Sequence, residues 1–81
     1  MMATVTLLYF ASLREVAGTA TERIDVDAGT LRALYAQASR RHGFALPPER
    51  LRVAVDGAFA GWDDAVRDGS EVAFIPPVSG G

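Results

Sequence analysis

The sequence contains no cysteine, no lysine and only one histidine. Without cysteine the chain has no disulfide, no thiolate metal site and no cysteine nucleophile, so any redox role needs a cofactor supplied from elsewhere. Without lysine it offers no side-chain amine for a Schiff base or an acyl group. His42 follows Arg40 and Arg41 in the predicted last turn of a helix, where cations suit the helix dipole, so we expect no metal site.

Long apolar runs and runs of one charge are also absent. The 81 residues carry a formal net charge of −2 with no basic run, which argues against a nucleic acid partner. No stretch is long and apolar enough for a membrane span, and Met1–Ala11 lacks the basic start of a signal peptide. A short chain without disulfides fits a reducing compartment, so we expect one small cytoplasmic domain.

Runs rich in β-branched and aromatic residues predict strands over 4–10, 20–26, 51–55, 58–60 and 71–75. Asp56-Gly57 between the third and fourth runs predicts a hairpin turn, since both turn positions need a positive φ. Thr30 and Gly43 bound the one convincing helix, as N-cap and C-terminal stop. Ala11–Gly18 is short, and we expect one helical turn there, capped by Ser12 and ended by Gly18.

A single helix with an apolar stripe is available to cover a single sheet, which predicts an α+β fold of two layers. We expect a mixed sheet of about five strands covered by one main helix, with the first and last strands parallel in its middle. This is the β-grasp, or ubiquitin-like, arrangement. The predicted core consists of Val5, Leu7, Leu31, Leu34, Ala38, Val72 and Phe74. Phe10, Phe59 and Ile75 would gather on the opposite face, and because monomers seldom leave large apolar patches in water, this cluster predicts a docking site for a partner protein.

The last strand ends at two prolines and the chain ends on two glycines, in the order Pro76, Pro77, Val78, Ser79, Gly80 and Gly81. Proline lacks the N–H that sheet pairing needs, so we expect a domain over 1–75 and a protruding tail over 76–81. Glycine has no Cβ, so Gly80 and Gly81 form the slimmest end a polypeptide can have, one that fits a narrow channel. This predicts that the reactive group is the terminal carboxylate of Gly81.

Four segments together resemble one family, the small, sulfur-carrying subunit of molybdopterin synthase. They are Leu8-Tyr9-Phe10-Ala11, Leu13-Arg14-Glu15-Val16-Ala17-Gly18, Val53-Ala54-Val55 and residues 68–81. The resemblance covers nearly the whole chain, and the ending Pro-Pro-Val-Ser-Gly-Gly is specific to this group among ubiquitin-like proteins. One departure is Asp56, where relatives commonly have asparagine, but Asp-Gly makes the same turn.

The resemblance implies a reaction cycle at Gly81. An E1-like enzyme adenylates the Gly81 carboxylate with ATP, and sulfur then replaces AMP to leave a thiocarboxylate. This sulfur is donated to cyclic pyranopterin monophosphate in the active site of the large subunit, during molybdenum cofactor biosynthesis. The resemblance therefore implies a chain that is no enzyme on its own. Such a chain holds no cofactor or metal, leaves ATP to its activating partner, and forms a heterotetramer with the large subunit.

The resemblance also implies roles for individual residues. Phe10, Phe59 and Ile75 match apolar contacts to the large subunit, and Pro76–Gly81 matches an arm inserted into it. Arg14 and Glu15 match a recurring pair that we expect to contact a partner. The residues themselves leave three alternatives open. Gly81 would equally serve a sulfur carrier of another pathway (thiamine, cysteine or tRNA thiolation) or a protein modifier conjugated to lysines elsewhere, whereas a plain interaction domain would not need it.

Overall fold

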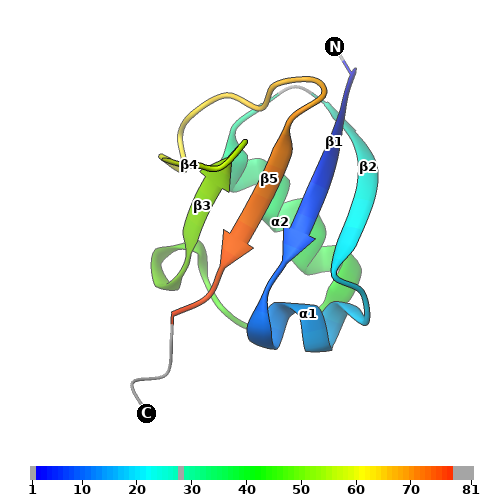
Figure 1. Ribbon diagram of the computed structural model, residues 1–81, viewed down its shortest axis with the longest axis vertical. Helices are drawn as coiled ribbons and strands as arrows, with labels where there is room; N and C mark the ends of the chain where they lie inside the picture. The colour runs from blue at the N-terminus through cyan, green and yellow to red at the C-terminus, as the bar shows by residue number, and fades with distance from the viewer. Residues whose placement is uncertain (1, 28, 78–81) are drawn as a thin grey trace.

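Five strands form one mixed sheet in the order β2-β1-β5-β3-β4. They are β1 (Met2–Tyr9), β2 (Thr21–Asp27), β3 (Arg52–Val55), β4 (Ala58–Ala60) and β5 (Glu71–Ile75), joined by the helices α1 (Ala11–Ala17) and α2 (Leu31–His42) and a 3₁₀ turn at Pro48–Arg50. This computed structural model describes residues 2–27 and 29–77. The first and last strands lie side by side in the middle of the sheet (Figure 1).

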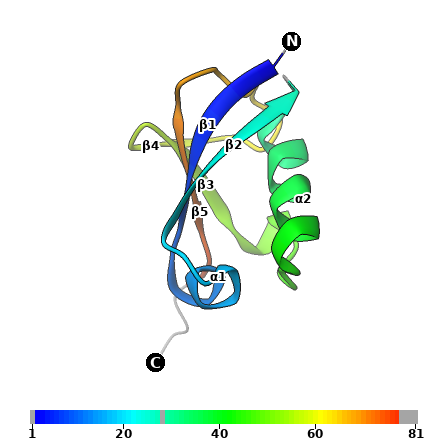
Figure 2. The same ribbon diagram turned by 90° about the vertical axis from the view of Figure 1, so that its right-hand side faces the viewer.

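The two central strands run parallel, and every other pairing in the sheet is antiparallel. β1 and β5 are in register from Thr6 opposite Glu71 to Tyr9 opposite Phe74. α2 packs against one face of the sheet, and no helix of the described residues covers the other face, which we call the open face (Figure 2). This is the β-grasp arrangement that the order of elements predicts, and that prediction is confirmed.

The main helix begins and ends where its sequence indicates. The Thr30 side-chain oxygen accepts a hydrogen bond from the backbone N–H of Ala33 at 3.1 Å, which satisfies a donor that the first helical turn leaves free. Gly43 has a φ of 78°, and its N–H donates to the carbonyl of Ser39 at 2.7 Å. Glycine adopts the left-handed conformation without the steric cost that a Cβ imposes, so the helix stops there.

The short helix differs from its prediction in two respects: it spans seven residues rather than a single turn, and its N-cap is not the predicted residue. Ser12 does not cap α1, because Phe10 holds the N-cap position with an extended backbone and Ser12 already lies inside the helix. The amide of Leu13 donates to the carbonyl of Phe10 at 3.1 Å. Gly18 ends the helix with a φ of 76°, as predicted. β1 consequently ends at Tyr9 rather than Phe10, and the other strand ends fall within one or two residues of the predicted ones.

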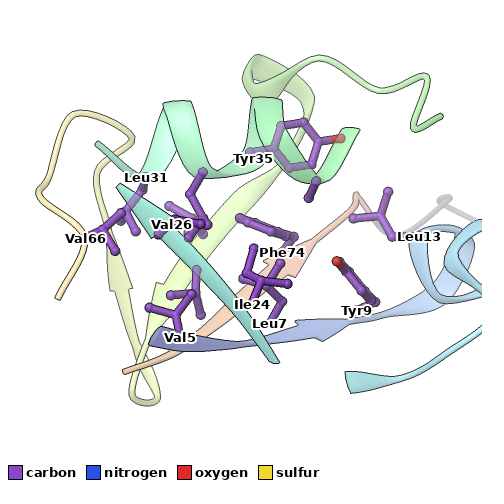
Figure 3. Packing of buried hydrophobic residues seen from close by; sticks show 14 of the residues in the cluster. Val5, Leu7, Tyr9, Leu13, Ile24, Val26, Leu31, Tyr35, Val66 and Phe74 are labelled. Atoms are coloured by element: carbon purple, nitrogen blue, oxygen red, sulfur yellow. The ribbon is translucent and has the colours of Figure 1, made fainter. Parts of the chain in front are cut away.

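The core lies between the sheet and α2, and aromatic rings fill its centre (Figure 3). The Phe74 side chain is fully buried, with its ring centroid 5.0 Å from that of Tyr35 and 6.4 Å from that of Tyr9. Trp62 stacks on Phe74 at 6.1 Å with 16° between the ring planes. All seven side chains of the predicted core are buried. No helix of the described residues is long and apolar enough to cross a membrane, and the cytoplasmic location stays a prediction.

Candidate docking face and tail exit

The open face carries a row of apolar side chains across four strands. Leu8 of β1 stands opposite Ala73 of β5, Ala73 stands opposite Ala54 of β3, and Ala54 stands opposite Phe59 of β4. Residues directly opposite one another in a ladder point to the same face of the sheet. The four side chains therefore form one continuous band that α2 does not cover.

Two more side chains extend this band toward the end of the sheet where β5 stops. Phe10 and Ile75 line the same open recess as the row, a hollow of about 300 Å³ that also touches Gly57 and Glu71. Phe59 is 68% exposed and Phe10 is 46% exposed. Exposed aromatic side chains gathered on one face are typical of a protein interaction site. We call this hollow, from Leu8 and Phe10 to Phe59 and Ile75, the apolar recess.

The chain leaves the sheet directly beside the apolar recess. Ile75 is the last residue of β5, Pro76 is buried and Pro77 is exposed. Neither proline has an N–H to continue the ladder, so sheet pairing stops here for a local reason. Val78, Ser79, Gly80 and Gly81 lie outside the described residues, and the division into a domain over 1–75 and a tail over 76–81 stays a prediction.

The structure brings together some of the predicted contact residues and not others. Phe10, Phe59 and Ile75 all line the apolar recess. Arg14 and Glu15 are exposed on α1 and do not line it. The partner-binding roles of all five side chains stay predictions.

A further charged residue belongs to this face and was missed from the sequence. Arg52 stands opposite Ile75 across the β3–β5 ladder, and its guanidinium carbon lies 5.2 Å from the centroid of the Phe59 ring. The alternation of β3 would have identified it, because Val53 faces the core and Arg52 must then face outward. The sequence pattern predicted β3 as a strand, but its side chains were not assigned to the two faces of the sheet.

A polar cluster lies on the helix side of the sheet, and its centre is Glu22 of β2. The Tyr9 hydroxyl donates to Glu22 Oε1 at 2.7 Å, and His42 Nε2 lies 2.9 Å from the same oxygen. Arg41 Nε approaches Glu22 Oε2 at 3.2 Å. The Glu22 side chain is only 15% exposed. His42 is therefore held at its helix end by a carboxylate, in addition to the favourable dipole.

The cluster shifts two pKa values in opposite directions. Burial opposes ionisation of Glu22, but its hydrogen bonds with His42 and Tyr9 and the nearby cations outweigh burial, and the pKa of Glu22 is lowered. Burial, followed by the hydrogen bond to Glu22, raises the pKa of Tyr9. The described residues contain no group of three or more side chains able to hold a metal ion. The cluster joins β1, β2 and the end of α2, and structural ion-pair networks of this kind also perturb pKa values.

Comparisons with known proteins point to one family. The model of the ThiS family matches residues 7–81. The molybdopterin synthase sulfur carrier subunit of Escherichia coli is 39% identical over 80 residues, covering 95% of this chain and 99% of that protein. The subunit of the same name from Haemophilus influenzae is 35% identical over 78 residues, covering 93% and 96%.

A solved structure gives the same result for the fold. The small archaeal modifier protein 1 of Haloferax volcanii has a TM-score of 0.82 and 30% identity, and the match covers 94% of this chain and 99% of that one. A family model matching nearly the whole chain, together with curated relatives of equal length, confirms the resemblance predicted from the sequence. The chain belongs to the ThiS family, among the relatives of the molybdopterin synthase sulfur carrier subunits.

Proposed function

We propose that this protein is the sulfur carrier of a molybdopterin synthase, and that the apolar recess docks the large subunit. The observation that carries the proposal is the position of the recess beside Ile75 and Pro76. A partner seated there receives the chain from Pro77 onward in one fixed direction. Support comes from relatives of nearly equal length that are named molybdopterin synthase sulfur carrier subunits.

The chemistry takes place at the Gly81 carboxylate. A carboxylate oxygen attacks the α-phosphorus of ATP in the E1-like enzyme, releasing pyrophosphate and leaving an acyl adenylate. A sulfur nucleophile then attacks the acyl carbon, and AMP departs with the C–O electron pair. With sulfur at the oxidation level of hydrosulfide, the product is a thiocarboxylate. Its sulfur attacks cyclic pyranopterin monophosphate in the large subunit, which joins Gly81 to the pterin as a thioester. Water then cleaves the bond between the sulfur and the Gly81 carbonyl carbon, which leaves the sulfur on the pterin and returns the Gly81 carboxylate. Two such transfers build the dithiolene that will hold molybdenum.

The chain supplies the sulfur and the partners supply the catalytic groups. The chain has no cysteine. Among the described residues, Tyr9, Glu22 and Tyr35 have shifted pKa values, and these side chains serve packing and one ion-pair network. We therefore assign acid–base catalysis and substrate binding to the large subunit, and adenylation with ATP to the activating enzyme. The complete enzyme is a heterotetramer with two small subunits on a large-subunit dimer, and the small subunit carries no cofactor.

The test is an intact mass of the untagged chain purified from its own cells. A fraction heavier by the difference between one sulfur and one oxygen, mapped to Gly81, supports the proposal. The extra mass must disappear on incubation with the large subunit and pterin precursor. A variant extended by one alanine after Gly81 is the control, since it keeps the folded domain but moves the carboxylate. Only free carboxylate in cells with an active molybdenum pathway, even after activating enzyme and ATP are added, rejects the carrier role.

A second candidate function is protein modification through Gly81. The observation that favours it is the similarity to a solved structure named small archaeal modifier protein 1. The same adenylate would then end in an isopeptide bond to a lysine of another protein. Denaturing electrophoresis and tryptic peptide mass spectrometry would reveal lysines bearing residues 68–81, because Arg67 is the last trypsin site of the chain. If cells that accumulate the thiocarboxylate contain no such conjugates, protein modification is rejected and the carrier role stands. Identifying the partner that removes the sulfur distinguishes a carrier for another pathway from these two functions.

A further inference from the structure

Arg52 is a cation at the boundary between the apolar recess and the tail exit. Its ladder partner is Ile75, the last residue of β5, and its guanidinium lies 5.2 Å from the Phe59 ring. Both of these neighbours line the apolar recess. Among the described residues, arginine ion pairs are made by Arg32 and Arg41 and none by Arg52. Its partner within the described chain is therefore an aromatic ring and not a carboxylate.

A protein that contacts both Phe59 and Ile75 in the apolar recess also covers Arg52, because Arg52 is the ladder partner of Ile75 and lies beside the Phe59 ring. Covering a guanidinium removes its water, and a ring at this distance compensates only a part of that loss. A buried charge without a counter-ion is strongly unfavourable, whereas a carboxylate opposite it restores the lost hydrogen bonds, often in bidentate form. The partner surface therefore needs an acidic group at this point.

The opposite end of the recess carries the opposite charge. Glu71 opens β5 and also lines the apolar recess, whereas Arg52 stands beside the end of the same strand. Four residue steps along a strand separate the two positions by about 13 Å. A partner turned end for end would bring its acidic group against Glu71, and like charges in contact disfavour that orientation. The two charges thus select one direction of docking.

We propose that Arg52 is a specificity-determining residue of the docking face, which pairs with a carboxylate on the large subunit next to the point where the tail enters it. This inference rests on the proposed function, because it takes the large subunit as the occupant of the apolar recess. Arg52 does not touch the reacting atoms. It acts by selecting the partner and setting its orientation, so its loss changes affinity and leaves the sulfur chemistry intact.

The experiment measures binding of the full chain to the large subunit of the same organism by calorimetry, at about 0.05 M and about 0.5 M NaCl. The variants are Arg52→Met, which keeps an apolar stem without charge, and Arg52→Glu. The matched control is Arg23→Glu, which changes the net charge equally. Arg23 stands on β2 opposite Thr6 and lines a different, polar hollow with Thr4 and Asp68.

We expect Arg52→Met to weaken binding at least about tenfold and Arg52→Glu at least about a hundredfold. Arg23→Glu should change it less than about threefold. The native affinity should fall with salt more steeply than that of Arg52→Met. Far-ultraviolet circular dichroism and the thermal midpoint check that each variant folds, which is expected for a side chain on the exposed face of β3. At saturating large subunit, single-turnover sulfur transfer by Arg52→Met should match that of the native chain.

Two results would overturn the inference. Arg52→Met binding as tightly as the native chain, or more tightly, would mean that no carboxylate meets Arg52. Equal weakening by Arg52→Glu and Arg23→Glu would mean that only net charge matters. If the native chain itself does not bind the large subunit, the proposed function fails. If it binds and the Arg52 variants bind equally well, only the role of Arg52 fails.

Discussion

The Tyr9 hydroxyl donates a hydrogen bond to Glu22 Oε1 at 2.7 Å, and this contact links the side chains of β1 and of the edge strand β2. The same oxygen lies 2.9 Å from His42 Nε2, so it also ties the end of α2 to β2. Three elements therefore meet at one carboxylate. The ionised Glu22 therefore adds to the backbone ladder that joins β1 and β2 and to the core packing that holds α2.

Stability should consequently fall in acid. The pKa of Glu22 is lower in the folded protein than the ordinary value of 4.5. A depressed carboxylate pKa contributes stability that is complete above the unfolded pKa and is lost as pH falls through the folded pKa. We expect the free energy of unfolding, from urea titrations, to drop over this range below pH 4.5.

The variant Glu22→Gln isolates this effect. It should lower stability at neutral pH by about 1–2 kcal/mol, because charge-assisted hydrogen bonds become neutral ones. It should also flatten the acid dependence relative to the native chain. Asp27→Asn, on the same strand but exposed and outside the network, is the control. An unchanged acid slope in Glu22→Gln would show that other carboxylates cause the loss.

Phe74 should be the most sensitive position of the core. Its side chain is fully buried among Tyr9, Tyr35 and Trp62, so truncation leaves a cavity between sheet and helix. We expect Phe74→Ala to cost about 3–5 kcal/mol and Phe74→Leu clearly less. The fluorescence of Trp62, the only tryptophan, reports unfolding because its ring stacks on Phe74. A loss below about 1 kcal/mol in Phe74→Ala would contradict this packing.

The β3–β4 hairpin gives a prediction about one carboxylate oxygen. Asp56 has a φ of 50°, and its Oδ1 accepts a hydrogen bond from the amide of Glu71 at 2.9 Å. Asparagine tolerates this backbone and keeps an acceptor, so Asp56→Asn should be nearly neutral. Asp56→Ala loses both advantages and should cost about 1–2 kcal/mol. Thermal unfolding compares the two, and equal midpoints would mean that neither the hydrogen bond nor the backbone conformation matters.

Truncation of Phe59 should weaken docking without destabilising the fold. Its side chain is 68% exposed, so Phe59→Ala should change the free energy of unfolding by less than about 0.5 kcal/mol. Under the proposed function it should weaken large-subunit binding about tenfold or more, since exposed aromatics on such faces are frequent hot spots. Val16→Ala is the control, because Val16 is 54% exposed but lies on α1 and does not line the apolar recess. Calorimetry with the large subunit measures both, and equal affinities would remove Phe59 from the interface.

The sequence alone determined the local events of this fold. Thr30, Gly18, Gly43 and Asp56-Gly57 act through hydrogen bonds and φ values that depend on a few neighbouring residues, and all of them behave as predicted. The inward positions of β1 and β5 were equally readable, because alternate side chains of a strand point to the same face of the sheet. Ser12 was assigned wrongly because a cap depends on where the preceding strand ends, and a propensity does not report that.

Only the tertiary structure decided which distant residues meet. Glu22 and His42 lie on different elements, and no periodicity indicates that they share an oxygen with the Tyr9 hydroxyl. Arg52 reaches Phe59 and Ile75 only because β3 pairs with β4 on one side and with β5 on the other. Strand order and register are set by the summed packing of the whole core. The cation beside the tail exit is therefore a product of the assembled sheet, whereas the Gly-Gly ending could be read directly from the chain.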